Sequence, residues 1–280
     1  MGELEFDDEI LETAVQRKPV LAVFAEEPRY RRELQEALDY SKATCHRIIR
    51  SFDERGLLRR TDDGYELTEL GQAVAAQVEA FERNIRTAYQ LNPLLEAFDS
   101  VAVDFDVELF TDATIVRPQP DDPSPPVHRY LELFREARSV RTLARTSFVP
   151  PLYLDEIFET AFTDDKKGGI VIYPKSVVEK RYAEYPEWHR KVAEQGIPLR
   201  YRIYDRSPFG MTIYDDDHVG LRAYDEETGT LVLFADTDNP AALSWAEDVF
   251  DYYYERSEPL GAFDSFPDWV PDSDVYDEIP

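Results

Sequence analysis

The chain has 280 residues, which is enough for one large domain or two ordinary ones with substantial apolar cores. Its 58 acidic residues outnumber 31 basic ones, and the formal net charge of −27 argues against a uniformly basic nucleic-acid-binding protein. The single cysteine excludes an intrachain disulfide framework and a cysteine-rich zinc site. The N-terminus is acidic and no run approaches about 18 apolar residues, so we expect a soluble, cytoplasmic protein without a membrane partner.

Only seven of the 31 basic residues are Lys, and an acidic, lysine-poor composition is similar to that of haloarchaeal cytoplasmic proteins. In molar salt the Debye length falls to about 3 Å, so the net charge says little about binding partners. The distribution of charge along the chain is therefore more informative than its sum.

The first 70 residues have the pattern of helices followed by a hairpin. Apolar residues at helical spacing cover 9–24, where Pro19 is expected to break the helix in two, and Pro28 is expected to begin the next helix. Ser41 is a suitable N-cap for a further helix that Gly56 ends, and two short strands then flank an Asp-Asp-Gly turn. This order predicts a winged helix-turn-helix.

Beyond this region the pattern is helical from Glu69 to Phe98, with Pro93 marking the end, and strands then alternate with helices. The expected strands are 101–118, 140–148, 168–174, 199–205, a pair over 209–225, and 229–236; the expected helices are 127–138, 152–162, 176–196 and 240–260.

We therefore expect an α+β protein with an α/β regulatory domain at its C-terminal side. Six acids and three prolines without a base after residue 263 predict disorder there. The expected parts are a winged helix-turn-helix DNA-binding domain (1–70), a linker or dimerisation helix (71–98), an α/β sensor or dimerisation domain (99–262) and an acidic disordered tail (263–280).

Basic residues are concentrated in 41–60, which holds six cations and two acids. If the apolar stripe from Cys45 to Phe52 faces inward, the outward side has short residues first and long cations after them, as a recognition helix has in the major groove. Arg47 would then read a guanine edge or hold a phosphate. The alternative is that these arginines pair with nearby acids on a solvated surface. The expected DNA contacts are Ser41, Lys42, Ala43, Thr44, His46, Arg47 and Arg50 on the helix, Arg59 and Arg60 in the hairpin, and Arg31 at the start of the preceding helix.

The stretch SKATCHRIIRSFDERGLLRRTDDGYELTELGQ (41–72) resembles the recognition helix and wing of archaeal ArsR- and MarR-like regulators. The stretches 109–143, 207–229 and 239–260 resemble the regulatory domain of the methanogenesis-regulator middle-domain type, which is paired with such winged helices in haloarchaea and methanogens. The resemblance covers about residues 8–262. It implies a transcriptional regulator, usually dimeric, whose second domain senses a signal, and it supplies no ligand.

The second domain is also distantly similar to the phospholipase D fold, whose chemistry needs a His with a Lys two residues later, supplied twice. Only His189 has such a partner, Lys191, in a stretch expected to be helical, where the two side chains point to nearly opposite sides. We therefore expect a catalytically degenerate domain and no enzyme. Nucleotide-binding glycine motifs and spaced metal ligands are missing from the sequence, so no cofactor or metal is expected; the run 215–218 is interpreted as a turn, with a cation site as the alternative.

An effector pocket in the second domain is expected at the ends of strands. The candidate ligand-binding residues are Arg145, Thr146, Ser147, Tyr173, Phe209 and Met211. Arg145 would suit an anionic metabolite, the alternative being an ion pair with a structural carboxylate. Trp245 is expected in the core, and Cys45 is expected there rather than acting as a redox sensor. A second domain that only dimerises would need no pocket.

The sequence thus predicts a sequence-specific, homodimeric transcription regulator that binds double-stranded DNA and is controlled by an effector or partner at its C-terminal domain. The alternative is a winged-helix module for protein contacts, joined to a scaffold or small-molecule-binding domain.

Overall fold

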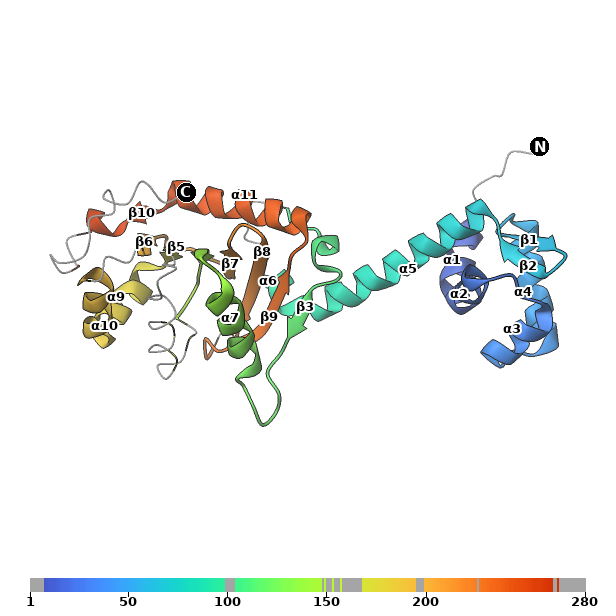
Figure 1. Cartoon of the computed structure of the whole chain (residues 1–280), viewed down its shortest axis with the longest axis horizontal. Coiled ribbons are helices and arrows are strands. Elements are labelled where there is room, and N and C mark those ends of the chain that lie inside the picture. The colour runs from blue at the N-terminus through green and yellow to red at the C-terminus, as the bar shows by residue number, and fades with distance from the viewer. Residues whose placement is uncertain are drawn as a thin grey trace. The chain divides into compact units, whose positions relative to one another are not determined.

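The computed structural model describes residues 8–98, 104–147, 149, 153, 157, 168–194, 199–225, 227–263 and 266. The chain divides into two compact units, Met1–Arg86 and Thr87–Pro280 (Figure 1). The division falls inside the long helix α5 (Glu69–Gln90). Among the described helices, none combines the length and the apolar character that crossing a bilayer requires.

The first unit consists of four helices, a two-stranded antiparallel hairpin and most of α5. The expected break at Pro19 is present, because this proline occupies the first turn of the second helix, where a missing N–H leaves no bond unmade. The elements before α5 are α1 (Asp8–Gln16), α2 (Lys18–Glu26), α3 (Arg31–Leu38), α4 (Lys42–Glu54), β1 (Leu58–Thr61) and β2 (Gly64–Leu67).

One apolar core joins these elements. It receives residues from α1, α2, α3, α4, the hairpin and α5, so that no helix of this unit stands apart from it. Its buried members are Ala14, Val20, Leu21, Phe24, Leu34, Cys45, Ile48, Ile49, Phe52, Leu57, Leu58, Leu67 and Val78.

The segment before α3 pairs with the hairpin, which the sequence did not predict. The backbone N–H of Arg29 donates to the carbonyl of Tyr65, and the N–H of Tyr65 donates to the carbonyl of Arg29, both at 2.9 Å. Residues 28–30 are therefore held out of the helix, and α3 begins at Arg31 rather than at Pro28. The expected helix is present, but its predicted start was wrong because a tertiary pairing fixes it.

The expected helix over 69–98 is interrupted at Leu91, which is completely buried. Helix α5 ends at Gln90, and a separate short helix, α6, covers Asn92–Phe98. Pro93 lies in the first turn of α6 instead of marking an end, again at a position where proline is tolerated.

The second unit is built on a mixed eight-stranded sheet with strand order β10-β6-β5-β4-β7-β8-β9-β3 (Figure 1). Three neighbouring strands, β4, β5 and β6, are parallel, and the other pairings are antiparallel. The strands are β3 (Thr114–Val116), β4 (Ser139–Leu143), β5 (Gly168–Tyr173), β6 (Leu199–Ile203), β7 (Gly210–Tyr214), β8 (His218–Tyr224), β9 (Leu231–Thr237) and β10 (Glu258–Pro259).

The two faces of this sheet carry different helices. Helix α11 (Pro240–Arg256) and α6 cover one face, where the expected core residue Trp245 is buried and donates its indole N–H to the Asp104 carbonyl at 2.9 Å. Helices α7 (Pro125–Glu136) and α9 (Lys175–Glu184) pack on the opposite face. Because side chains alternate along a strand, Met211 faces α11 whereas Thr212 does not.

Two expected elements of the second unit differ from the structure. The alternating pattern over 101–118 is a strand only at 114–116; before it lies a 3-10 turn, Val107–Phe110, which the Asp106 carboxylate caps by accepting from the Glu108 N–H at 2.9 Å. The helix over 176–196 is split at Tyr185 into α9 and α10 (Pro186–Glu194) by the following proline.

The expected helix over 152–162 lies outside the described residues apart from positions 153 and 157. So does the expected disordered tail, except that Phe263 and Phe266 pack against the cluster that contains Leu260, Val178 and Tyr201.

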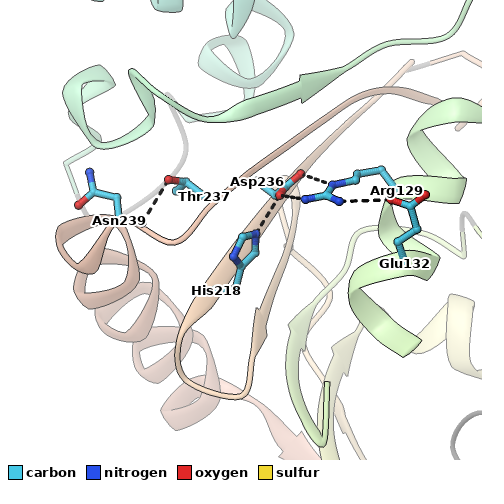
Figure 2. A network of polar contacts seen from close by, with 6 residues as sticks. All are labelled: Arg129, Glu132, His218, Asp236, Thr237 and Asn239. Carbon is cyan, nitrogen blue, oxygen red and sulfur yellow. Dashed lines mark hydrogen bonds and ion pairs between the residues drawn. The ribbon is translucent and has the colours of Figure 1, made fainter. Parts of the chain in front are cut away.

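A buried ion pair connects α7 to the sheet (Figure 2). Arg129 on α7 donates from Nε and Nη2 to the two carboxylate oxygens of Asp236 at 3.0 and 2.8 Å, and His218 Nε2 lies 2.8 Å from Asp236 Oδ1. Burial alone would raise the pKa of the Asp236 carboxyl, but the hydrogen bonds from His218 and Arg129 hold it below its ordinary value. Beside it, Asn239 caps α11 by accepting from the Ala241 N–H at 3.0 Å.

Replacing Asp236 by Asn should destabilise the second unit by roughly 3 kcal/mol, because it breaks a buried pair and leaves Arg129 without its charge partner there. Urea unfolding followed by tryptophan fluorescence reports this unit, since every Trp of the chain lies after residue 86. Glu132→Gln is the matched control: Glu132 contacts the same guanidinium at 3.2 Å but is exposed, so its loss should cost less than about 1 kcal/mol. Equal effects of the two substitutions would contradict this account.

Candidate nucleic-acid interface and effector site

The local sequence sets both ends of α4. Ser41 Oγ accepts a hydrogen bond from the Thr44 N–H at 3.1 Å, and Gly56, with a φ of 70°, ends the helix, both as predicted. The expected inward stripe from Cys45 to Phe52 is buried. Burial also raises the pKa of the Cys45 thiol, which disfavours the reactive thiolate and agrees with a place in the core.

The outward side of α4 is exposed and basic. Arg50 Nε donates to Glu54 Oε1 at 2.7 Å, an ion pair one turn along the same helix. Lys42 and Arg47, by contrast, form no ion pair with any of the described residues. Of the remaining predicted contacts, Ser41, Ala43 and His46 are exposed and Thr44 is half-buried.

The two arginines of the hairpin differ in the same way. Arg59 on β1 donates from Nε to Glu66 Oε1 on β2 at 2.6 Å. Arg60 is exposed and has no ion-pair partner in the part of the chain that the structure describes. Pairing with neighbouring acids thus accounts for Arg50 and Arg59 but leaves Lys42, Arg47 and Arg60 unneutralised.

Arg31 lies at the junction of α3 and the hairpin. Its Nη2 donates to the Tyr65 hydroxyl at 2.8 Å, and its guanidinium carbon stands 5.5 Å from the centre of the Tyr65 ring. The neighbouring Tyr30 hydroxyl donates to the Asp62 carbonyl in the hairpin turn at 2.9 Å. These contacts hold the start of α3 against the hairpin.

Helix α4, the hairpin and the start of α3 therefore present flexible cations around short or polar side chains. Such cations can donate to phosphate oxygens, and the short side chains at the start of α4 allow a base edge to approach. Outside this region of the first unit, Arg29, Arg32, Arg83 and Arg86 are paired with glutamates, whereas Arg17 has no ion pair among the described residues.

In the second unit the structure separates the predicted ligand-binding residues. Arg145, Thr146 and Ser147 form the loop after β4, and Tyr173 ends the neighbouring strand β5. Phe209 and Met211, however, are buried on the other face among the residues that pack against α11. These two therefore lie away from the other four candidates, and the ligand-binding role of the six stays a prediction.

Ser147 and Tyr173 meet at Arg181, which the sequence did not single out. Arg181 Nη1 donates to Ser147 Oγ at 2.7 Å, and its guanidinium carbon lies 5.8 Å from the centre of the Tyr173 ring. The only sequence signal is that Arg181 follows the buried Val178 by three positions on α9 and so shares its side of the helix.

The histidine that raised the question of phospholipase chemistry is buried. His189 lies on α10, as the expected helix requires, and stacks on Tyr182 with ring centres 3.9 Å apart. Burial, and secondarily the charge of Arg181, lowers the pKa of His189 to about 3, so its imidazole is neutral near pH 7. Lys191, two residues later, is exposed.

The acidic run 215–218 is a turn between β7 and β8, as interpreted from the sequence. Asp215 and Asp216 have φ values of 49° and 59°, and Asp215 Oδ1 accepts from the backbone N–H groups of Arg138 and Ser139 at 2.7 and 2.6 Å. Within the described ranges, no three His, Cys, Asp or Glu side chains gather as they would around a metal ion.

Two family models match the chain. Residues 7–90 match the HVO_A0261 N-terminal domain, and residues 123–256 match the middle domain of the methanogenesis regulatory protein FilR1. The predicted resemblance to a regulator of the methanogenesis-regulator middle-domain type is thereby confirmed. No curated protein matches the chain.

Several solved structures are distantly similar. TrmBL2, described as an archaeal chromatin protein with a novel mode of DNA binding, has a TM-score of 0.40 and 14% identity, over 91% of this chain and 100% of its own. NucT from Helicobacter pylori has a TM-score of 0.39 and 14% identity, over 53% and 98%. Phosphatidylserine synthase from Haemophilus influenzae has a TM-score of 0.39 and 13% identity, over 53% and 39%.

Proposed function

We propose that this chain, which carries an HVO_A0261 N-terminal domain and a FilR1 middle domain, is a dimeric, non-enzymatic transcription regulator that binds double-stranded DNA. In this proposal α3 and α4 are the two helices of a winged helix-turn-helix, α4 lies in the major groove and the β1–β2 hairpin is the wing. The regulatory role of the FilR1 family supports the assignment of the second unit as the part that responds to a signal.

The observation that carries the proposal is the set of unneutralised cations on α4 and the hairpin. A chain with net charge −27 has enough acidic side chains to pair with every basic one, and in the first unit most arginines are paired in this way. Lys42, Arg47 and Arg60 are exposed and lack an ion pair among the described residues. Their charges are available to phosphates, whose condensed counterions would be released on binding.

Arg47→Ala should weaken binding to a duplex enriched from random sequences by at least about tenfold, which corresponds to the roughly 1–3 kcal/mol of a base or phosphate contact. Fluorescence anisotropy against salt concentration measures this. A weaker dependence of affinity on salt concentration, with the same loss of affinity for every DNA sequence, would identify a phosphate contact. A loss of base preference at one position of the DNA site would identify a guanine contact.

Arg83→Ala is the matched control, because Arg83 is an exposed arginine on α5 that already pairs with Glu79 at 3.4 Å. Its affinity for the same duplex should stay within about twofold of the wild type. If Arg47→Ala bound DNA as Arg83→Ala does, α4 would not be the recognition helix. The alternative function, a winged-helix module for protein contacts, would then be favoured.

We further propose that two copies associate through a groove between α1 and α5. The groove has a volume of about 400 Å³. Six of the seven large hydrophobic side chains that are exposed in the described residues belong to these two helices. They are Leu11 and Val15 on α1 and Leu70, Phe81, Ile85 and Tyr89 on α5. The groove is lined by Ile10, Leu11, Ala14, Val15, Ala73, Val74, Gln77, Val78 and Phe81.

A second copy fits this surface because the surface is complementary to itself. The groove and the protruding Phe81 ring lie on the same side, so a two-fold axis brings the ring of each copy to the groove of the other. Glu82 and Arg86 lie along one flank of the apolar side of α5. In an antiparallel pair of α5 helices with the axis near residue 84, each Glu82 lies opposite Arg86 of the second copy.

Phe81→Glu should convert the dimer into a monomer, since it places a charge in the centre of this apolar contact. Light scattering coupled to size-exclusion chromatography measures the mass directly. Tyr30→Glu is the control, because Tyr30 is equally exposed, at 53% against 55% for Phe81, but lies at the start of α3. A monomeric wild type, or a Phe81→Glu variant that stays dimeric, would exclude this interface.

A further inference from the structure

Arg181 is a buried cation that no acidic side chain among the described residues neutralises. It is 9% exposed, and Nη1 donates to Ser147 Oγ at 2.7 Å. Its guanidinium carbon lies 5.8 Å from the ring centres of both Tyr173 and Trp188, and it also forms a hydrogen bond with the Tyr201 side chain. Its Nε has no hydrogen-bond partner, and no ion pair of the described residues includes it.

This arrangement is costly without an anion. An arginine stays protonated in proteins, and an unpaired charge taken out of water carries a large desolvation penalty that cation–π contacts only partly offset. The chain has 58 acidic residues, so a structural counter-ion would be easy to supply. For comparison, the half-buried Arg129 of this unit is matched by Asp236, and the fully buried Arg222 donates to four hydroxyl and carbonyl oxygens.

We propose that Arg181 and Ser147, with Tyr201, form a binding site for the oxyanion group, phosphate or carboxylate, of a small molecule. The guanidinium Nε is the unused donor, and the Ser147 hydroxyl lies within hydrogen-bond distance of the same guanidinium. An oxyanion placed there accepts from both and neutralises the buried charge.

The position in the fold supports a ligand site. Ser147 follows β4 and Tyr173 ends β5, so the site lies at the carboxyl ends of two adjacent parallel strands, beside β7, where the sheet becomes antiparallel. Open α/β sheets bind ligands at this edge, where the strand order changes direction. Arg145 and Ser147 are exposed, so the site has a rim that is open to solvent.

The surrounding titratable groups leave the site positive near pH 7. Burial raises the pKa of Tyr201 to about 12, although Arg181 opposes this, so the phenol keeps its proton and can donate it to a ligand oxygen. His189 on α10 is neutral, as described above. The described groups around Arg181 therefore offer donors and no competing carboxylate.

The use of this site by an effector rests on the proposed function as a regulator, because the oxyanion is then the chemical class of the signal that the second unit senses. Binding itself does not require DNA. The test is isothermal titration calorimetry of the full chain with sodium phosphate and, separately, with sodium acetate, each replacing chloride at constant ionic strength.

The wild type should bind at least one of the two anions, and the anion preferred distinguishes phosphate from carboxylate. Arg181→Gln should weaken that binding by at least about tenfold, as expected for a charge-assisted hydrogen bond. Arg190→Gln should leave the Kd unchanged, because Arg190 is an exposed arginine on the neighbouring α10 that pairs with Glu187. Ser147→Ala, at an exposed position, should weaken binding several-fold and decides the case if Arg181→Gln does not fold.

Absence of binding of both anions to the wild type overturns the proposal, as does a Kd that neither Arg181→Gln nor Ser147→Ala changes. The wild type could bind the anion, the variants could lose that binding, and the chain could still fail to bind DNA. That result would support the oxyanion site and exclude only its regulatory role.

Discussion

The first unit depends on the pair of backbone hydrogen bonds between Arg29 and Tyr65. They join the segment before α3 to the hairpin through one isolated antiparallel bridge, and so fix the start of α3 relative to β2. Gly64 is required here, because its φ is +122° and a Cβ would overlap the carbonyl of Arg29. Helix α4 packs on α3 and on the hairpin, so the placement of its exposed cations follows from this pairing.

The two candidate sites differ in how their cations meet solvent. Some arginines outside them are matched by nearby carboxylates, as Arg129 is by Asp236 and Arg141 by Asp216 and Glu247. On α4 the unneutralised cations are exposed and suit a large polyanion. At Arg181 the unneutralised cation is buried and suits a small one. Both sites are positively charged, but one is open to solvent and the other is buried, so they suit anions of different size.

The parts of this account that the sequence predicted are those that local interactions decide. The Ser41 cap, the stripe from Cys45 to Phe52 and the end of α4 at Gly56 each depend on neighbours within one or two turns. The sequence could not predict contacts between distant segments: the pairing that delays α3, the burial of Leu91 that interrupts the long helix, or the meeting of Ser147 with Arg181, 34 positions apart. Arg181 resembles a surface cation in sequence, and only its packing distinguishes it.

The central claim is that α4 binds DNA, and genome-wide occupancy tests it most directly. Chromatin immunoprecipitation would compare the wild type with an Arg47→Ala/Arg50→Ala variant shown to be folded and expressed. The salt concentration inside the cell then sets how much the phosphate contacts contribute to DNA affinity. The account predicts discrete promoter peaks for the wild type that disappear in the variant. An absence of peaks in the wild type, or peaks unchanged in the variant, would contradict it.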